Sequence, residues 1–266
     1  SCTAYSTHWT WDTYAMSSGT GKTIVKRGGK DWFFLTADYV FGKTLERDTA
    51  AVVEANGGKV LGSVRHPLGT VDFSSFLLQA QASKAKVIGL ANAGTDMTNA
   101  VKQSIEFGLQ RDGTQLVALI GFISDVHSLG LKDAQGLMLT SAFYWDLNDE
   151  TRAWSKRFYE KMKRMPSMTQ AGAYSGTLHY LKAVQAAGTR DADAVMAKMR
   201  ELPINDFMTK NGHLRIDGRV MRDMYLFQAK KPEESKSEWD LYKLVATIPA
   251  EEAYRPLKDG GCPLVK

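Results

Sequence analysis

The most constraining feature of the sequence is a unit that recurs between Asp31 and Ala142. In each copy a short apolar run is followed by a loop with small or polar residues and then by an amphipathic segment. Apolar runs of this length without polar alternation are typical of strands that are buried on both faces of a parallel sheet. The pattern therefore predicts an α/β fold with ligand-binding groups at the carboxyl ends of its strands.

The expected strands of this region are the apolar runs 32–35, 60–64, 87–90, 116–120 and 136–140. The segments between them carry apolar residues at three- and four-residue spacing, which predicts helices that cover the sheet on both sides. These helices are expected at 42–56, 73–83 and 97–107. A further helix is expected from Asp12 or Thr13 to Lys26, ending at Gly28-Gly29.

Beyond Ala142 the alternation stops, and the pattern predicts consecutive helices followed by a hairpin-like section. The helices are expected at 149–164, 170–187 and 192–201, and the strands at 213–216, 224–228 and 241–248. We place the strands of the hairpin-like section in a different layer from the first five. The sequence thus predicts two lobes, a complete α/β lobe at 13–142, to which 239–266 returns, and a partial second lobe at 143–238.

Composition and charge exclude several function classes. The formal net charge is +5, but the basic residues are scattered, whereas a nucleic-acid-binding face needs a clustered basic footprint, so no nucleic-acid partner is expected. No apolar run reaches the length of about 18 residues that a membrane-spanning helix needs. The first residues are neither an initiator Met nor a charged and apolar leader, so we expect a leader to have been removed already.

The two cysteines, Cys2 and Cys262, lie near the two chain ends and have no neighbours at metal-ligand spacing. Two free buried thiols are one interpretation. The terminal placement, with Cys262 in a Gly-Gly-Cys-Pro context, favours a Cys2–Cys262 disulfide and hence an oxidising compartment.

Several motifs suggest catalysis but fail on inspection. Gly19–Thr23 has the Gly-Lys-Thr of a phosphate-binding loop, yet Met16 stands where the earlier glycine is required, and no strand precedes it. Gly172–Gly176 has tyrosine where a nucleophile elbow needs serine, and it lies within a helical pattern. The five histidines show no metal-binding spacing. We therefore expect no catalytic residue, no metal and no cofactor.

Three strand-end loops remain as the candidate site: 36–39, 91–94 and 122–125. They combine aromatic rings, small residues and amide or hydroxyl groups at the edge where open α/β sheets bind ligands. Taken singly, Tyr39 could be a helix-start residue that packs on the sheet, and Asn92 a turn former. Three such loops at one edge favour a binding site.

The sequence resembles a known family in several runs, namely Phe33–Gly42 (FFLTADYVFG), Asn56–Val60 (NGGKV), Asp72–Ser75 (DFSS) and Gln170–Tyr174 (QAGAY). These runs are similar to the periplasmic substrate-binding proteins of ABC importers, in the type I, Leu/Ile/Val-binding group. The resemblance implies a Venus flytrap of two lobes that closes around a small solute and hands it to a membrane permease, without making or breaking a bond. It also implies a periplasmic location.

The resemblance assigns ligand-binding positions to both lobes. They are Tyr39, Asn92, Ala93, Gly94, Phe122 and Ile123 in the first lobe, and Tyr144, Gln170 and Tyr174 at the crossover and in the second. In amino-acid-binding relatives a carboxylate near the Phe122-Ile123 position meets the ligand ammonium, but here both residues are apolar and Asp125 is out of step. We therefore favour a small aromatic or hydrophobic carboxylic acid as ligand, with branched-chain amino-acid binding and a ligand-sensing role in signalling as alternatives.

The sequence departs from the family pattern at its start. Family members begin with a strand–helix section of the other lobe, and that section is absent here. The apolar sides of helices 149–164 and 170–187 are then expected to be uncovered, which suggests a truncated chain, reduced solute affinity and a homodimer through the incomplete lobe.

Overall fold

The computed structural model describes residues 2–265, with the side chain of Asp112 excepted. The chain forms two compact units. The sheet unit comprises Asp12–Ser141 and Tyr225–Ile248. The helical unit comprises Ser1–Trp11, Ala142–Met224 and Pro249–Lys266. No helix in the described part of the chain is both long enough and apolar enough to cross a bilayer.

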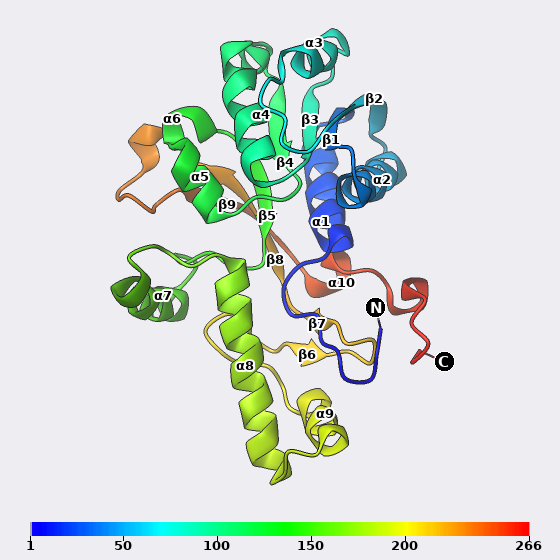
Figure 1. Cartoon of the computed structure of the whole chain (residues 1–266), viewed down its shortest axis with the longest axis vertical. Helices are drawn as coiled ribbons and strands as arrows, with labels where there is room; N and C mark the ends of the chain where they lie inside the picture. Colours follow the sequence, from blue (N-terminus) through cyan, green and yellow to red (C-terminus); the bar gives the residue numbers. More distant parts are fainter. Residues whose placement is uncertain (1, 266) are drawn as a thin grey trace. The chain divides into compact units, whose positions relative to one another are not determined.

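The sheet unit contains a seven-stranded sheet in the order β2-β1-β3-β4-β5-β8-β9 (Figure 1). Its first five strands pair in parallel, as the sequence predicts. The seven strands are β1 (Asp31–Ala37), β2 (Lys59–His66), β3 (Val87–Ala91), β4 (Gln115–Ala118), β5 (Met138–Ser141), β8 (Met224–Ala229) and β9 (Tyr242–Ile248).

Two expectations about these strands are wrong. Strand β8 does not belong to a different layer, because it pairs antiparallel with β5, Met138 opposite Gln228. Strand β2 is not uniformly buried, because it is the edge strand of the sheet and most of its side chains are exposed or half-buried; His66 at its end is the exception. By contrast β1 and β3, which lie inside the sheet, are buried along almost their whole length.

The helices of the sheet unit flank the strands in two groups, α1 beside α2, and α4 beside α3, α5 and α6 (Figure 1). They are α1 (Thr13–Lys26), α2 (Val40–Ala55), α3 (Ser74–Ala82), α4 (Gly94–Glu106), α5 (Ile123–Leu129) and α6 (Leu131–Ala134), with a 3-10 turn at Leu109–Asp112. Helix α1 starts where Asp12 accepts a hydrogen bond from the Ala15 amide at 2.7 Å. It ends at Lys26, and Gly28, which follows the C-cap residue Arg27, has a φ of +99° that suits glycine. The Gly-Lys-Thr run therefore lies inside a helix, as expected.

The helical unit contains α7 (Asp149–Met162), α8 (Met168–Ala187), α9 (Ala192–Glu201), α10 (Ala250–Ala253) and a hairpin of β6 (His213–Leu214) and β7 (Val220–Met221). It also contains a 3-10 turn at Leu257–Gly260, and the sheet unit has a further 3-10 turn at Pro232–Glu234. The core of the unit gathers Trp9, Ala183, Val195, Met196, Met199, Ile204, Leu214 and Val220. The predicted Cys2–Cys262 disulfide is present and joins the two ends of this unit.

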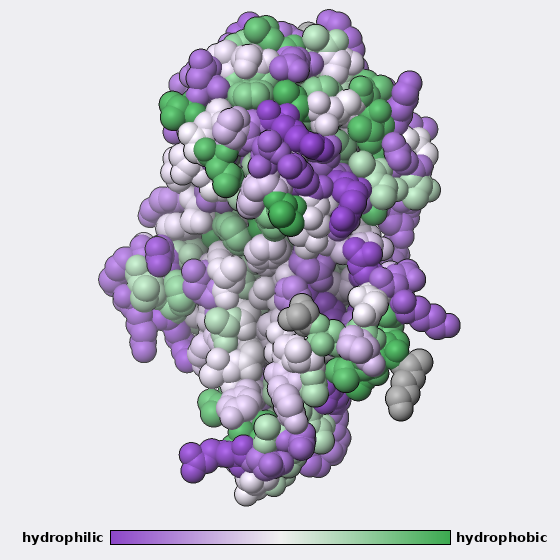
Figure 2. All heavy atoms as spheres, turned by 45° about the vertical axis from the view of Figure 1, so that its right-hand side comes forward, coloured by the Kyte–Doolittle hydropathy of each residue, from purple (hydrophilic) through white to green (hydrophobic). Residues whose placement is uncertain are grey.

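The boundaries of the units differ from the expected lobes at two places. Residues 225–238, expected in the partial lobe, belong to the sheet unit because β8 hydrogen-bonds to β5. Residues 249–266, expected to return to the first lobe, belong to the helical unit, where Cys262 bonds to Cys2. Figure 2 shows that hydrophobic residues on one face of the molecule form separate small groups among hydrophilic ones.

Candidate functional site

Three of the predicted ligand-binding residues occupy equivalent places at the carboxyl edge of the sheet. Tyr39, Ala93 and Phe122 are the N-cap residues of α2, α4 and α5, which follow β1, β3 and β4. Each has an extended backbone. The side chains of Tyr39 and Ala93 make no capping hydrogen bond. Since the first amides of a helix have no intrahelical acceptor and the helix dipole is positive there, this edge favours an anion such as a carboxylate.

Gly42 explains how closely two of these loops approach each other. A β-carbon at this position would lie 2.3 Å from the carbonyl oxygen of Ala37 and 2.9 Å from that of Ala91. The first turn of α2 therefore rests directly on the ends of β1 and β3. Only glycine permits this contact, which brings the Tyr39 loop next to the Asn92-Ala93-Gly94 loop.

Asn92 is fully buried and pairs with a histidine that the sequence reasoning missed. The side-chain nitrogen Nδ2 of Asn92 lies 3.0 Å from Nε2 of His66, which closes strand β2. The other ring nitrogen, Nδ1, lies 2.8 Å from the carbonyl oxygen of Pro67. Both side chains have an exposed fraction of 0%. A lone histidine carries no spacing signal, so this pair is revealed only by the order β2-β1-β3, in which the ends of β2 and β3 approach each other across β1.

A second missed residue is Asp96, a buried carboxylate in the first turn of α4. Its Oδ2 accepts a hydrogen bond from the Gly69 amide at 3.2 Å. Burial raises the pKa of Tyr39, and the negative charge of Asp96 raises that pKa further. The strand-end edge therefore does contain a carboxylate. The signal in the sequence was an acid at the start of a helix, which on its own indicates only a favourable interaction with the helix dipole.

The Phe122 loop is arranged differently from the other two. Asp125 accepts a hydrogen bond from the Phe122 amide through Oδ2 at 2.8 Å, so this carboxylate caps its own helix. Burial raises the pKa of Asp125, and the hydrogen bond from Phe122 partly opposes that shift. Ile123 is buried within the sheet unit, whereas Phe122 is half-buried.

The predicted residues of the helical unit have mixed environments. Tyr144 is buried beside the ring of Trp145, with ring centroids 5.9 Å apart. Gln170 belongs to a capping box, since its Oε1 accepts hydrogen bonds from the amide and the hydroxyl of Ser167, at 2.9 and 2.6 Å. Tyr174, 41% exposed, has its ring 5.4 Å from that of Trp154. These contacts give Gln170 a structural role and leave one face of Tyr174 open.

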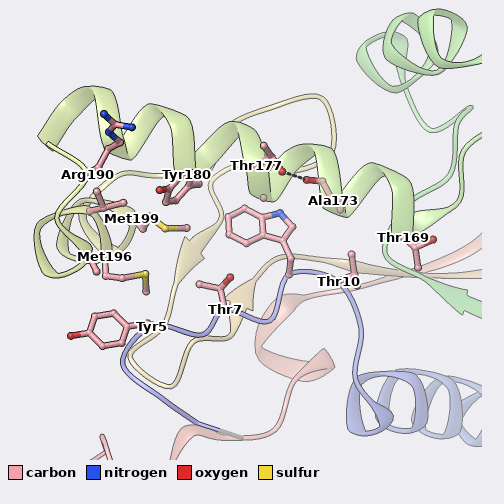
Figure 3. Close-up of a pocket in the computed structure, with 15 residues that line it drawn as sticks. Tyr5, Thr7, Thr10, Thr169, Ala173, Thr177, Tyr180, Arg190, Met196 and Met199 are labelled. Atoms are coloured by element: carbon pink, nitrogen blue, oxygen red, sulfur yellow. Dashed lines mark hydrogen bonds between the residues drawn. The ribbon is translucent and has the colours of Figure 1, made fainter. Parts of the chain in front are cut away.

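A pocket of about 550 Å³ runs along α8 in the helical unit (Figure 3). Tyr180 and Arg190 lie at one end and Thr10 and Thr169 at the other, while Met196 and Met199 of α9 form much of the apolar wall. Small residues let the N-terminal segment lie directly on α8: a β-carbon at Gly172 would be 2.0 Å from Cγ2 of Thr10. We call this surface the α8 pocket.

Trp9, which lines the α8 pocket, begins a chain of buried and partly buried hydrogen bonds. The indole Nε1 of Trp9 donates to Oγ of Ser175 at 2.9 Å. The Ser175 hydroxyl in turn donates to Oδ2 of Asp206 at 2.5 Å, while Oδ1 of Asp206 accepts from the amides of Met208 and Thr209. Ser175 is thus a structural residue inside a helix, as the failed nucleophile-elbow pattern suggests. Among the residues described, no cluster of three or more His, Cys, Asp or Glu side chains could hold a metal ion.

The sheet order and the flanking helices define an α/β protein of the open-sheet class, in which ligands bind at the carboxyl ends of the strands. Residues 1–236 match the model of the periplasmic binding protein family, and the chain belongs to that family. The family is one of solute-binding receptors, and the fold is that of the type I members, as the sequence resemblance implies.

Two solved structures are similar over the whole chain. A periplasmic binding protein from Burkholderia mallei is 56% identical, with a TM-score of 0.92 and coverage of 100% of this chain and 70% of that one. A branched-chain amino-acid ABC transporter periplasmic ligand-binding protein from Burkholderia xenovorans LB400 is 40% identical, with a TM-score of 0.94 and coverage of 100% and 71%.

Curated relatives are more distant. A Leu/Ile/Val-binding protein homolog 6 from Brucella melitensis is 24% identical over 238 residues, which are 85% of this chain and 58% of the relative. The chain therefore spans little more than half the length of the curated relatives that it matches.

Proposed function

We propose that this chain is part of a periplasmic receptor that binds a small carboxylic acid, aromatic or hydrophobic, and delivers it to the permease of an ABC transporter. The observation that carries the proposal is the strand-end edge of the sheet unit. There the first turn of α2 rests on the ends of β1 and β3, and α4 begins directly after β3; neither Tyr39 nor Ala93 caps its helix with a side-chain hydrogen bond. This edge provides amide donors and aromatic surface, and it needs no catalytic group.

The proposal that the solute is a carboxylic acid follows from the charge distribution at this edge. The amides at the starts of α2 and α4 attract a negative group, and the half-buried rings of Tyr39 and Phe122 suit a flat or apolar body. A solute-binding protein of an ABC transporter from R. palustris, which shares the fold at 17% identity and a TM-score of 0.80, was crystallised with benzoate. That complex supports an aromatic acid as one class to test.

Branched-chain amino acids remain the second candidate because of one residue. Asp96 is a buried carboxylate close to Tyr39, and an ammonium group needs an ionic partner when it leaves water. The 40% identical structure from Burkholderia xenovorans is a branched-chain amino-acid ABC transporter periplasmic ligand-binding protein, which supports the same candidate. Asp96 supplies the group that the apolar Phe122-Ile123 position lacks.

Isothermal titration with benzoate, cinnamate, leucine and valine separates these candidates. We expect the acids without an ammonium group to bind, and Asp96→Asn to leave their affinity within about threefold. If leucine and valine alone bind, and if Asp96→Asn weakens them by about tenfold or more, the amino-acid candidate replaces the acid. An interaction of roughly 1.4 kcal/mol corresponds to that factor.

We also propose that the α8 pocket is a contact surface for a second copy of this chain. The pocket is lined mainly by apolar and small residues, and its margin includes Tyr180, which is 43% exposed. Exposed apolar surface of this kind marks interaction sites in soluble proteins.

A further inference from the structure

The contact between His66 and Asn92 determines which atom of the Asn92 side-chain amide has no hydrogen-bond partner among the described residues. The imidazole of His66 lies between the ends of β2 and β3. Its ring meets that of Phe73 edge to face, with centroids 4.8 Å apart, and the ring of Phe76 at 6.0 Å. One ring nitrogen faces the Pro67 carbonyl and the other faces the Asn92 amide. Within residues 2–265 these are the two polar contacts of the ring, and their chemistry determines its tautomer.

The tautomer follows from the Pro67 contact. A carbonyl oxygen only accepts hydrogen bonds, so Nδ1 of His66 must carry a proton and donate it. The ring is fully buried, and no carboxylate in the described part of the chain hydrogen-bonds to it, so protonating both nitrogens would bury an unpaired charge. Nε2 is then an acceptor, and Asn92 must donate to it through Nδ2.

The remaining atom of that amide is an acceptor without a donor. Oδ1 of Asn92 is buried and has no hydrogen-bond partner among the described residues. A buried acceptor in this state lowers stability unless some group donates to it. Asn92 directly precedes Ala93, the N-cap of α4, whose first amides favour a carboxylate.

We propose that Oδ1 of Asn92 accepts a hydrogen bond from the solute, so that the receptor prefers an acid with an added O–H or N–H donor over the unsubstituted acid. His66 is the positioning residue, because its tautomer prevents the Asn92 amide from turning over. This proposal rests on the proposed function and specifies the solute further. A hydroxy acid and an amino acid both supply the donor, and the experiment separates the two.

The binding test compares solutes that differ only in the donor. Titration calorimetry is run with benzoate against 4-hydroxybenzoate, and with 3-methylbutanoate against 2-hydroxy-3-methylbutanoate and valine. We expect a donor-bearing member to bind at least tenfold more tightly than its parent acid in one series. Asn92→Leu, which has a similar volume and no acceptor, should reduce the ratio of the two affinities to about one. The proposal is overturned if Asn92→Leu still prefers the donor-bearing acid, or if the wild type shows no such preference.

The role of His66 is tested through the ratio of affinities rather than the affinity itself. In His66→Gln the amide can still donate to Pro67 and accept from Asn92, so the preference should be retained. In His66→Phe nothing holds the orientation of the Asn92 amide, so its oxygen and nitrogen can exchange places. The ratio of the affinities for donor-bearing and parent acid should then fall towards one. A merely structural role would weaken parent and donor-bearing acids equally, and such a result contradicts the positioning role.

Long-range ¹H–¹⁵N spectra of the ligand-free protein test the tautomer independently of any solute. A protonated Nδ1 and an unprotonated Nε2 are expected for His66, and the opposite tautomer overturns the proposal. The outcomes also separate this proposal from the function on which it rests. Acids that bind without a donor preference refute the proposal alone, whereas the failure of every acid to bind removes the proposed function and this proposal with it.

Discussion

At the scale of single residues, Gly42 is the position with the least tolerance. In Gly42→Ala the new methyl group would have to move two backbone carbonyls, those of Ala37 and Ala91. We expect a loss of about 1–3 kcal/mol in the free energy of unfolding, measured by urea denaturation. Alanine is favoured over glycine inside a helix by about 1 kcal/mol, so a net loss shows that the clash dominates. Gly260→Ala, where a β-carbon meets nothing within 4 Å, is the control.

A second residue-scale prediction concerns pH and Asp125. Burial raises the pKa of Asp125, so its stabilising contribution is fully present below the unfolded pKa of about 3.9 and is lost as pH rises through the folded pKa. Asp125→Asn keeps an oxygen that accepts from the Phe122 amide and removes the charge. The variant should therefore gain stability over the wild type between about pH 4 and pH 7, measured as the difference in urea midpoint. A constant difference over this range would contradict the prediction.

The residues of the candidate site were predictable only in part. Tyr39, Ala93 and Phe122 follow strands along the chain, and the structure places all three at N-cap positions of one sheet edge. His66 and Asp96 could not be found in this way. His66 contacts Asn92 across an intervening strand, and Asp96 lies in the first turn of α4 rather than in the loop, so their place at the site is a tertiary property.

At the scale of elements, the disulfide is the strongest link within the helical unit. It joins residues 260 positions apart, so it restricts the unfolded chain considerably. Reduction, or the double change Cys2→Ser and Cys262→Ser, should lower the free energy of unfolding by roughly 2–5 kcal/mol. Thermal denaturation with and without reductant measures the effect. The double variant should not respond to reductant, and equal midpoints for oxidised and reduced wild type would refute the prediction.

Elements with local signals were predictable, and those defined by distant pairing were not. The five parallel strands carry apolar runs and helices in regular alternation, and each formed within a few residues of its expected bounds. Strand β8 also formed where expected, yet its place in the sheet depends on β5, more than eighty residues earlier in the chain. The hydrophobic pattern of a segment predicts that it forms a strand. The packing of the whole unit determines which other strand it pairs with.

At the scale of the whole molecule, the two units differ in how completely their apolar surfaces are covered. The sheet unit has helices packed along its strands. The helical unit has a sheet of only two strands of two residues each, and the α8 pocket lies open beside Trp9. The α8 pocket is therefore the surface where self-association of this chain is expected.

Light scattering coupled to size-exclusion chromatography tests this expectation over a range of concentrations. We expect the wild type to shift from monomer to dimer as its concentration rises, because apolar area in the α8 pocket leaves water on association. Thr177→Glu and Tyr180→Glu, both on the exposed side of α8, should keep the chain monomeric, since each would place a charge in the interface. Val71→Glu, at an apolar position of the sheet unit that is 77% exposed, should dimerise like the wild type. A wild type that stays monomeric throughout, or a Val71→Glu variant that dissociates as readily as Tyr180→Glu, would place the self-association surface elsewhere or remove it.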